Sequence, residues 1–208
     1  MKITLYGASG MIGSRILDEL MSRGHDVLAV VRNPSRITRT DVEVRAGNVL
    51  DPRSVIETAT DADAAISAYA PPEEATEKLL DATETLISAL KEAGVLRFLM
   101  VGGAGNLEVA PGVPVVDTPA FPPEWKSHGL AHKGALSVLK RSGLDWTSIS
   151  PAAMIQPGEH TGKFRLSGST FITDESGQSR ISAEDFAAAL VDELEQPRHL
   201  RQLLGVAY

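Results

Sequence analysis

Three glycines stand at every third position near the amino terminus, Gly7, Gly10 and Gly13. They follow a short apolar run and open an amphipathic stretch, which is the pattern of a strand-to-helix turn. The free N–H groups and positive dipole end of a helix bind phosphate at such a turn. We expect Gly7 and Gly10 to leave room for the pyrophosphate of a dinucleotide, with Ser9 adding a hydroxyl. Gly13 would let the helix pack closely on the strand.

The next apolar run ends in VVRNPSR, which has two arginines, Arg32 and Arg36, and no carboxylate. An acidic residue at this place holds the adenosine ribose of NAD, whereas an arginine can hold a 2′-phosphate by charge-assisted hydrogen bonds. The pattern therefore favours NADP(H), with NAD(H) possible. The alternative interpretation is a solvated surface arginine.

A catalytic acid–base pair is harder to find. Lys133 occupies a predicted helix where short-chain dehydrogenases carry Tyr-x-x-x-Lys, but the residue four positions earlier is Gly129. The tyrosines of the chain stand elsewhere, at Tyr6, Tyr69 and Tyr208. Ordinary alcohol oxidation therefore lacks its base.

Two other kinds of site, a zinc site and a serine nucleophile, each lack a required residue. His128 and His132 have the i, i+4 spacing of zinc ligands, but no third ligand is evident, so we predict no metal. GASGM resembles a nucleophile elbow only until Met11, where that motif needs glycine. A serine hydrolase is improbable.

Alternating periodicities indicate the elements that would position these residues. Apolar runs predict strands, and amphipathic stretches between them predict helices. This order predicts an α/β fold, a Rossmann-like doubly wound parallel sheet with helices on both faces in three layers. We expect strands over 3–6, 26–32, 42–47, 62–70, 96–103 and 145–151, and helices over 12–24, 51–60, 76–94 and 124–143.

The last quarter of the chain changes character. Residues 151–182 mix Gly, Ser and Thr with short alternating runs, so we predict an irregular substrate-side insertion with a small hairpin over the carboxyl edge of the sheet. A closing helix over 183–196 and an edge strand over 203–208 would follow. We expect one domain over 1–208.

The composition of the chain limits the classes of function that it can have. The 208 residues carry a formal net charge of −7, which disfavours a nucleic-acid partner. No stretch has the length and apolarity of a membrane span, and the absence of cysteine fits a reducing cytoplasm. We therefore predict a cytoplasmic protein that binds small molecules.

The motifs together resemble those of the atypical short-chain dehydrogenase/reductase family, in the group with NADH-flavin reductase-like, biliverdin reductase B-like and NmrA-like proteins. The resemblance runs nearly end to end. It rests on GASGMIG, VVRNPSR, GNVLD, VGGAGNL, AHKGALSVLKRSGLDWTSISPAAM, GKFRL and SRISAEDFA.

This resemblance implies an NADPH-binding core with a shallow apolar pocket for a planar acceptor, with FMN or FAD as a possible substrate. The residues implied in cofactor binding belong to the turns at the carboxyl edge and to one helix. For the phosphates they are Gly7, Ser9, Gly10, Met11, Ile12, Gly13, Arg32 and Arg36. For the adenine they are Asn48 and Val49, and near the nicotinamide they are Gly102, Gly103, Pro151 and Ala152. The stretch AYAPP, residues 68–72, ends the fourth strand where the pyrophosphate and the nicotinamide ribose would pass, so Ala70 and Pro71 are further cofactor candidates, as is Lys133.

His132 matches a histidine of the biliverdin reductase pocket, while the second histidine position of that pocket is Ala153. His132 would either donate a proton or serve as a satisfied helix histidine. Three functions follow: an NADPH-dependent reductase of a flavin or quinone, a non-catalytic NADP(H) sensor, or a sugar-nucleotide epimerase or dehydratase. We expect a monomer or a homodimer.

Overall fold

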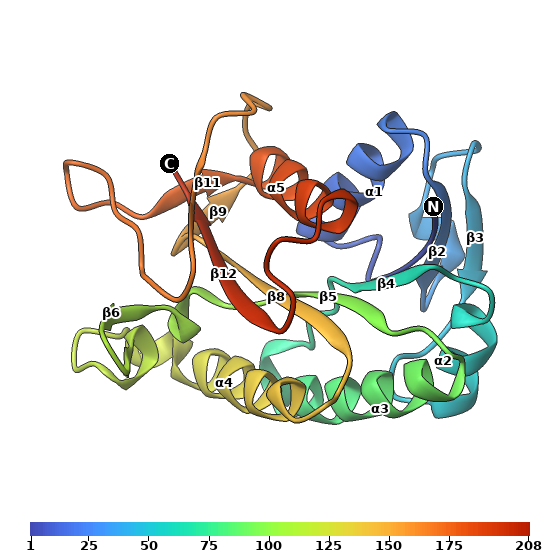
Figure 1. Ribbon diagram of the computed structural model, residues 1–208, viewed down its shortest axis with the longest axis horizontal. Helices are drawn as coiled ribbons and strands as arrows, with labels where there is room; N and C mark the ends of the chain where they lie inside the picture. The colour runs from blue at the N-terminus through green and yellow to red at the C-terminus, as the bar shows by residue number, and fades with distance from the viewer.

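The computed structural model describes residues 1–208 and has a central eight-stranded sheet (Figure 1). The strand order is β10-β12-β8-β5-β4-β1-β2-β3, and every neighbouring pair is parallel except β10 with β12. The chain order reverses between β1 and β4, which makes a topological switch point there. The strands are β1 Lys2–Tyr6, β2 Asp26–Val31, β3 Glu43–Ala46, β4 Ala64–Ser67, β5 Arg97–Val101, β8 Asp145–Pro151, β10 Arg165–Ser167 and β12 Gln202–Ala207.

Five helices cover the two faces of the sheet (Figure 1). Helices α1, Met11–Ser22, and α5, Ala183–Glu195, lie side by side on one face. The other face carries α2, Pro52–Ala59, α3, Lys78–Glu92, and α4, Lys126–Lys140. This arrangement confirms the predicted Rossmann-like three-layer fold.

Each face of the sheet has its own apolar core. Ile16 and Phe186 pack with the strands on the α1–α5 side, and Leu90 and Trp146 pack on the α3–α4 side. Full burial of a large apolar side chain stabilises a fold by roughly 1.5–3 kcal/mol. None of the helices combines the length and the apolar character that crossing a bilayer requires.

Local signals explain several helix boundaries. The Asp51 side chain accepts a hydrogen bond from the Arg53 N–H, and Pro52 stands at the first helical position of α2. Gly24, with φ of +76°, follows the end of α1. These are the boundaries that the sequence pattern predicts, to within two residues.

The carboxyl-terminal quarter corrects two expectations. The predicted hairpin within 151–182 is wrong, because β9, Met154–Gln156, pairs in parallel with β11, Arg180–Ser182. A hairpin forms instead from β6, Glu108–Ala110, and β7, Val113–Pro114. The predicted strand over 203–208 is present as β12, but it is not at the edge of the sheet, because β10 pairs outside it. Strands of two or three residues have too little alternation to reveal their partners.

Candidate functional site

A cavity of about 660 Å³ lies at the carboxyl ends of β1, β2, β3 and β4. Ligands of open α/β sheets bind at this edge, beside the switch point. Backbone loops form most of the wall, and α3 closes one end with its first residue. The lining residues are Gly7, Ser9, Gly10, Val30, Val31, Arg32, Arg36, Ala46, Gly47, Asn48, Val49, Leu50, Asp51, Ser54, Ala68, Tyr69, Ala70, Pro72 and Lys78.

The three amino-terminal positions require glycine for different physical reasons. Gly7 has φ of +79°, and an added Cβ would lie 2.6 Å from the Ala68 carbonyl oxygen, so backbone packing against the end of β4 requires it. A Cβ at Gly13 would lie 2.1 Å from the Gly7 carbonyl oxygen, which matches the expected close packing of α1 on the turn. The expectation that Gly7 leaves space for a ligand is therefore corrected, because a neighbouring loop fills that space.

Gly10 alone faces open space. The nearest atom to an added Cβ there is the Gly7 carbonyl oxygen at 3.4 Å, and Gly10 lines the cavity. No side chain caps α1, whose first N–H groups therefore lack intrahelical or side-chain acceptors. Free N–H groups beside open space fit a diphosphate.

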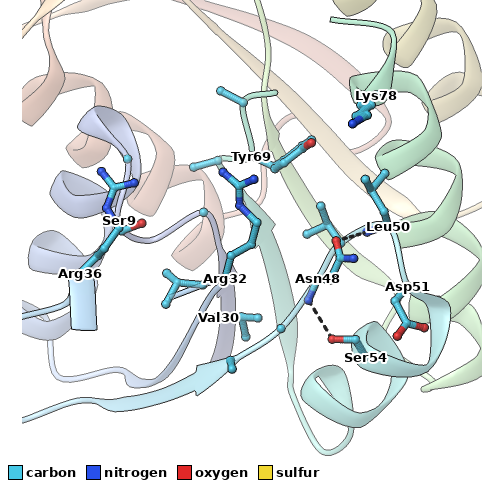
Figure 2. A pocket seen from close by; sticks show the side chains of 18 of the residues that line it. Ser9, Val30, Arg32, Arg36, Asn48, Leu50, Asp51, Ser54, Tyr69 and Lys78 are labelled. Carbon is cyan, nitrogen blue, oxygen red and sulfur yellow. Dashed lines mark hydrogen bonds between the residues drawn. The ribbon is translucent and has the colours of Figure 1, made fainter. Parts of the chain in front are cut away.

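Three cationic side chains line the cavity, and none of them has a carboxylate partner within salt-bridge distance (Figure 2). Arg36 lies beside Ser9, Arg32 lies near Tyr69, and the Lys78 ammonium points toward the same space (Figure 2). Burial raises the pKa of Tyr69, and the Arg32 charge opposes part of that shift. An unpaired cationic cluster in a chain of net charge −7 fits a ligand with several phosphates.

The loop after β3 forms the wall opposite the glycine turn. The Asn48 side-chain oxygen accepts a hydrogen bond from the Leu50 N–H at 3.0 Å. The Asn48 N–H donates to Ser54 Oγ at 2.9 Å, as Figure 2 shows. Both contacts fix the conformation of the loop at this wall of the cavity.

The structure brings eight of the predicted cofactor residues to this cavity and places the others outside it. Those that line it are Gly7, Ser9, Gly10, Arg32, Arg36, Asn48, Val49 and Ala70. Those that do not are Met11, Ile12, Gly13, Pro71, Gly102, Gly103, Lys133, Pro151 and Ala152, together with the catalytic candidate His132.

Sequence reasoning missed Tyr69 and Lys78 as lining residues. Tyr69 belongs to AYAPP, residues 68–72, directly after β4, and this position at the carboxyl edge was the available signal. Lys78 belongs to α3, and only the fold brings it to the loops after β2 and β3.

Side chains pack closely against the two glycines that follow β5. An added Cβ at Gly102 would lie 2.6 Å from Ser150 Oγ, and one at Gly103 would lie 2.9 Å from His132 Cγ. Lys133 Nζ binds both carboxylate oxygens of Asp117, at 2.8 and 2.6 Å. In this arrangement Lys133 is directed to the 3-10 helix Val115–Asp117.

Gly129, where the Tyr-x-x-x-Lys motif of short-chain dehydrogenases has its tyrosine, has no room for a side chain. An added Cβ would lie 2.6 Å from Val116 Cγ2 and 2.9 Å from Phe121 Cζ. The segment that contains Val116 and Phe121 thus fills the place of the missing tyrosine.

The surroundings of His132 argue against both of its expected roles. Burial, with a smaller contribution from the His128 charge, lowers its pKa to about 4, so it is neutral near pH 7 and is a poor general acid there. Its Nδ1 is enclosed without a hydrogen-bond partner, so it is not a satisfied helix histidine.

The remaining tyrosines are occupied elsewhere. Tyr6 OH lies 3.0 Å from Thr58 Oγ1, and burial raises the pKa of Tyr6 to about 12. Tyr208 OH donates to Asp185 Oδ2 at 2.7 Å. No group of three or more His, Asp or Glu side chains is arranged to hold a metal ion.

Comparison with known families agrees with this geometry. The family model described as NAD(P)H-binding matches residues 7–197. Among curated proteins, the uncharacterized protein YwnB of Bacillus subtilis is 37% identical over 210 residues, covering 99% of this chain and 98% of YwnB.

Solved structures resemble the chain over its whole length. A candidate exported protein from Burkholderia pseudomallei is 47% identical with a TM-score of 0.93, covering 100% of both chains. A candidate epimerase from Bacteroides thetaiotaomicron is 40% identical with a TM-score of 0.93, covering 100% of this chain and 96% of its own. A candidate NADH-flavin reductase from Streptococcus pneumoniae is 33% identical with a TM-score of 0.91, covering 100% and 99%.

Proposed function

The chain belongs to the NAD(P)H-binding family, and from this premise we propose that it is an NADPH-dependent reductase that passes hydride to a planar acceptor such as a flavin or a quinone. The observation that carries the choice of cofactor is the cavity in which Arg32, Arg36 and Lys78 have no carboxylate partner. Charge-assisted hydrogen bonds from arginine to a 2′-phosphate contribute roughly 1.5–3 kcal/mol each.

Different residues of the cavity would bind different parts of the cofactor. Arg32 and Arg36 hold the 2′-phosphate, and the uncapped first turn of α1 holds the pyrophosphate over Gly10. The Asn48 loop lies against the adenine. When bound, the nicotinamide supplies the hydride. The contribution of the chain is to hold that ring and the acceptor face to face.

The acceptor side supports reduction of a delocalised ring system. Alcohol oxidation and sugar epimerisation both need an acid–base group at the substrate carbon, and Val116 and Phe121 fill the place of that group at Gly129. A flavin or quinone spreads the developing charge over its rings and can take its proton from water. The packing at Gly129 therefore favours a reductase over an epimerase, although one similar structure is described as a candidate epimerase.

A second function, an NADP(H) sensor without turnover, is favoured by one observation. His132 is neutral and no tyrosine stands beside it, so the chain offers no strong proton donor at the carboxyl edge of β5. Such a protein would bind the cofactor and report its state to a partner.

Oxidation of NADPH with candidate acceptors tests the proposal. The absorbance of NADPH is followed with FMN, lumiflavin or menadione, and NADH serves as the comparison. We expect steady oxidation with at least one acceptor and a higher kcat/KM for NADPH than for NADH. Tight NADP⁺ binding with no turnover of any acceptor would contradict the reductase and leave the sensor.

A further inference from the structure

The carboxylate of Asp185 is buried in the first turn of α5 and has no cationic partner. The residue is 0% exposed, and none of the salt bridges of the chain involves it. Its Oδ1 accepts hydrogen bonds from the Thr161 and Gly162 N–H groups, each at 2.8 Å. Its Oδ2 accepts from Thr161 Oγ1 at 2.6 Å and from Tyr208 OH at 2.7 Å. Four donors thus replace the water and the counter-ion that a buried carboxylate otherwise requires.

The same donors determine the charge of this carboxylate. Burial raises the pKa of Asp185, but the hydrogen bonds from Thr161, Gly162 and Tyr208 lower it more, so the pKa lies below its usual range. Asp185 is therefore ionised at neutral pH, and its hydrogen bonds are charge-assisted.

Three of the four donors belong to one segment, residues 157–163, which we call the strap. Every residue of the strap is exposed, and none of them makes a backbone–backbone hydrogen bond. Gly162 has φ of +67°, which glycine adopts without strain, and its N–H and the preceding N–H of Thr161 reach the same oxygen of Asp185. All hydrogen bonds that attach the strap to the fold therefore involve side chains.

The amino-terminal half of the strap has three further attachments, each a single contact to α1 or to the start of α5. They are the Gly158 N–H with Glu184 Oε2 at 2.7 Å, Ser182 Oγ with the Glu159 carbonyl oxygen at 2.7 Å, and His160 Nε2 with Glu19 Oε2 at 3.1 Å. Asp185 alone makes as many bonds to the strap as these three pairs together. It is therefore the principal attachment.

The strap forms one wall of a second cavity, of about 380 Å³. From the strap, this cavity is lined by Pro157, Gly158, Glu159 and Thr161. Residues of β9 and β11, together with Tyr208, line the remainder. No residue of this lining belongs to the cofactor cavity. A movement of the strap would therefore change the second cavity and leave the cofactor cavity as it is.

We propose that the strap opens as a unit and that Asp185 is the latch that holds it closed. In the open state Thr161 and Gly162 leave the carboxylate, the second cavity loses one wall, and α5 and the sheet stay folded. Water can then reach the vacated oxygens while Tyr208 OH still donates to Oδ2, so opening leaves no buried charge unpaired. Exposed segments without backbone hydrogen bonds are the first to open in a folded protein.

Limited proteolysis with trypsin at neutral pH measures this opening. Lys163 is the last residue of the strap, whereas Arg97 lies in the central strand β5, where cleavage requires global unfolding. When opening is fast relative to cleavage, the rate follows the population of the open state. Mass spectrometry distinguishes the two cuts. We expect the wild type to be cleaved after Lys163 and to resist cleavage after Arg97 on the same time scale.

Replacement of the latch should favour the open state. Asp185→Asn keeps the size of the side chain and removes its charge, and we expect roughly 10- to 100-fold faster cleavage after Lys163, with cleavage after Arg97 unchanged. Thr161→Val removes one donor and should accelerate the same cut by roughly 3-fold. Asp192→Asn is the matched control, because Asp192 lies in the same helix, is 55% exposed and binds no strap residue. It should be cleaved like the wild type.

Two results would overturn the proposal. An unchanged rate after Lys163 in Asp185→Asn would show that this carboxylate is not the latch. Equal acceleration of both cuts in that variant would mean global unfolding, and Thr161→Val, which retains the charge of Asp185, then decides. Faster cleavage of Thr161→Val after Lys163 alone supports an opening confined to the strap, whereas a wild-type rate or equal acceleration after Arg97 contradicts it.

Discussion

The two halves of the carboxyl edge are built in opposite ways. At β1 to β4 the loops leave a cavity of about 660 Å³, and its cations have no partners. After β5, and in the neighbouring helix α4, side chains fill the spaces that Gly102, Gly103 and Gly129 leave, and Lys133 is paired with Asp117. The first half is open and cationic, which suits a charged ligand, whereas the glycines of the second half are closely packed.

Glycine-to-alanine substitutions are expected to have the largest effects on stability. The same change destabilises the fold at one glycine and stabilises it at another. Gly13→Ala would force a Cβ to 2.1 Å from the Gly7 carbonyl oxygen, and we expect a loss of stability of about 3 kcal/mol. In α4, Gly134→Ala meets only Leu80 at 3.9 Å and should stabilise by roughly 0.5–1 kcal/mol. Urea unfolding measures both. Equal stabilities would mean that the close approach of α1 to the turn is not as described.

Charge reversal at the open half tests the phosphate-binding role. We expect Arg32→Asp to weaken NADPH binding by roughly one to two decades, since it loses about 1.5–3 kcal/mol of charge-assisted hydrogen bonding, and to leave NADH nearly unchanged. Arg53→Asp, with the same charge change outside the cavity lining, is the matched control. Dissociation constants from calorimetry decide the result. An equal loss for both cofactors would show that Arg32 does not bind the 2′-phosphate.

In the packed half, burial of His132 is expected to make the free energy of unfolding depend on pH. The pKa of His132 is lowered by burial from 6.5 to about 4 in the folded state. The unfolded chain therefore binds the proton more readily, and stability is lost as the pH falls from about 6.5 toward 4, by roughly 2 kcal/mol. Urea unfolding at pH 7 and pH 4.5 should show this loss in the wild type and a smaller one in His132→Gln. The same pH dependence in both proteins would contradict the burial of this imidazole.

Gly10→Ala should have the smallest effect on the fold. The added Cβ is 3.4 Å from its nearest neighbour and faces the cavity. We expect unchanged unfolding but about tenfold weaker binding of NADPH and of NADH alike, because the methyl group takes space that the pyrophosphate needs. Unaltered binding of both would place the pyrophosphate elsewhere.

The same contrast explains what could be predicted from the sequence. The glycine turn, Arg32 and the Asp51 cap are local features, whose chemistry depends on neighbours a few residues away. Lys78 reaches the cavity only because α3 folds beside the β3 loop. Val116 lies 13 residues before Gly129 in the sequence, so no hydrophobic periodicity predicts that the two residues pack together. Local motifs thus predict much of the open half, and tertiary packing determines the packed half.

Calorimetric titration of the wild-type protein with NADPH and with NADH tests the central claim most directly. The account predicts binding of both at one site for each chain, with NADPH tighter by roughly one to two decades. Absence of binding heat for either nucleotide at several temperatures would contradict it, and a preference for NADH would contradict the role given to Arg32 and Arg36.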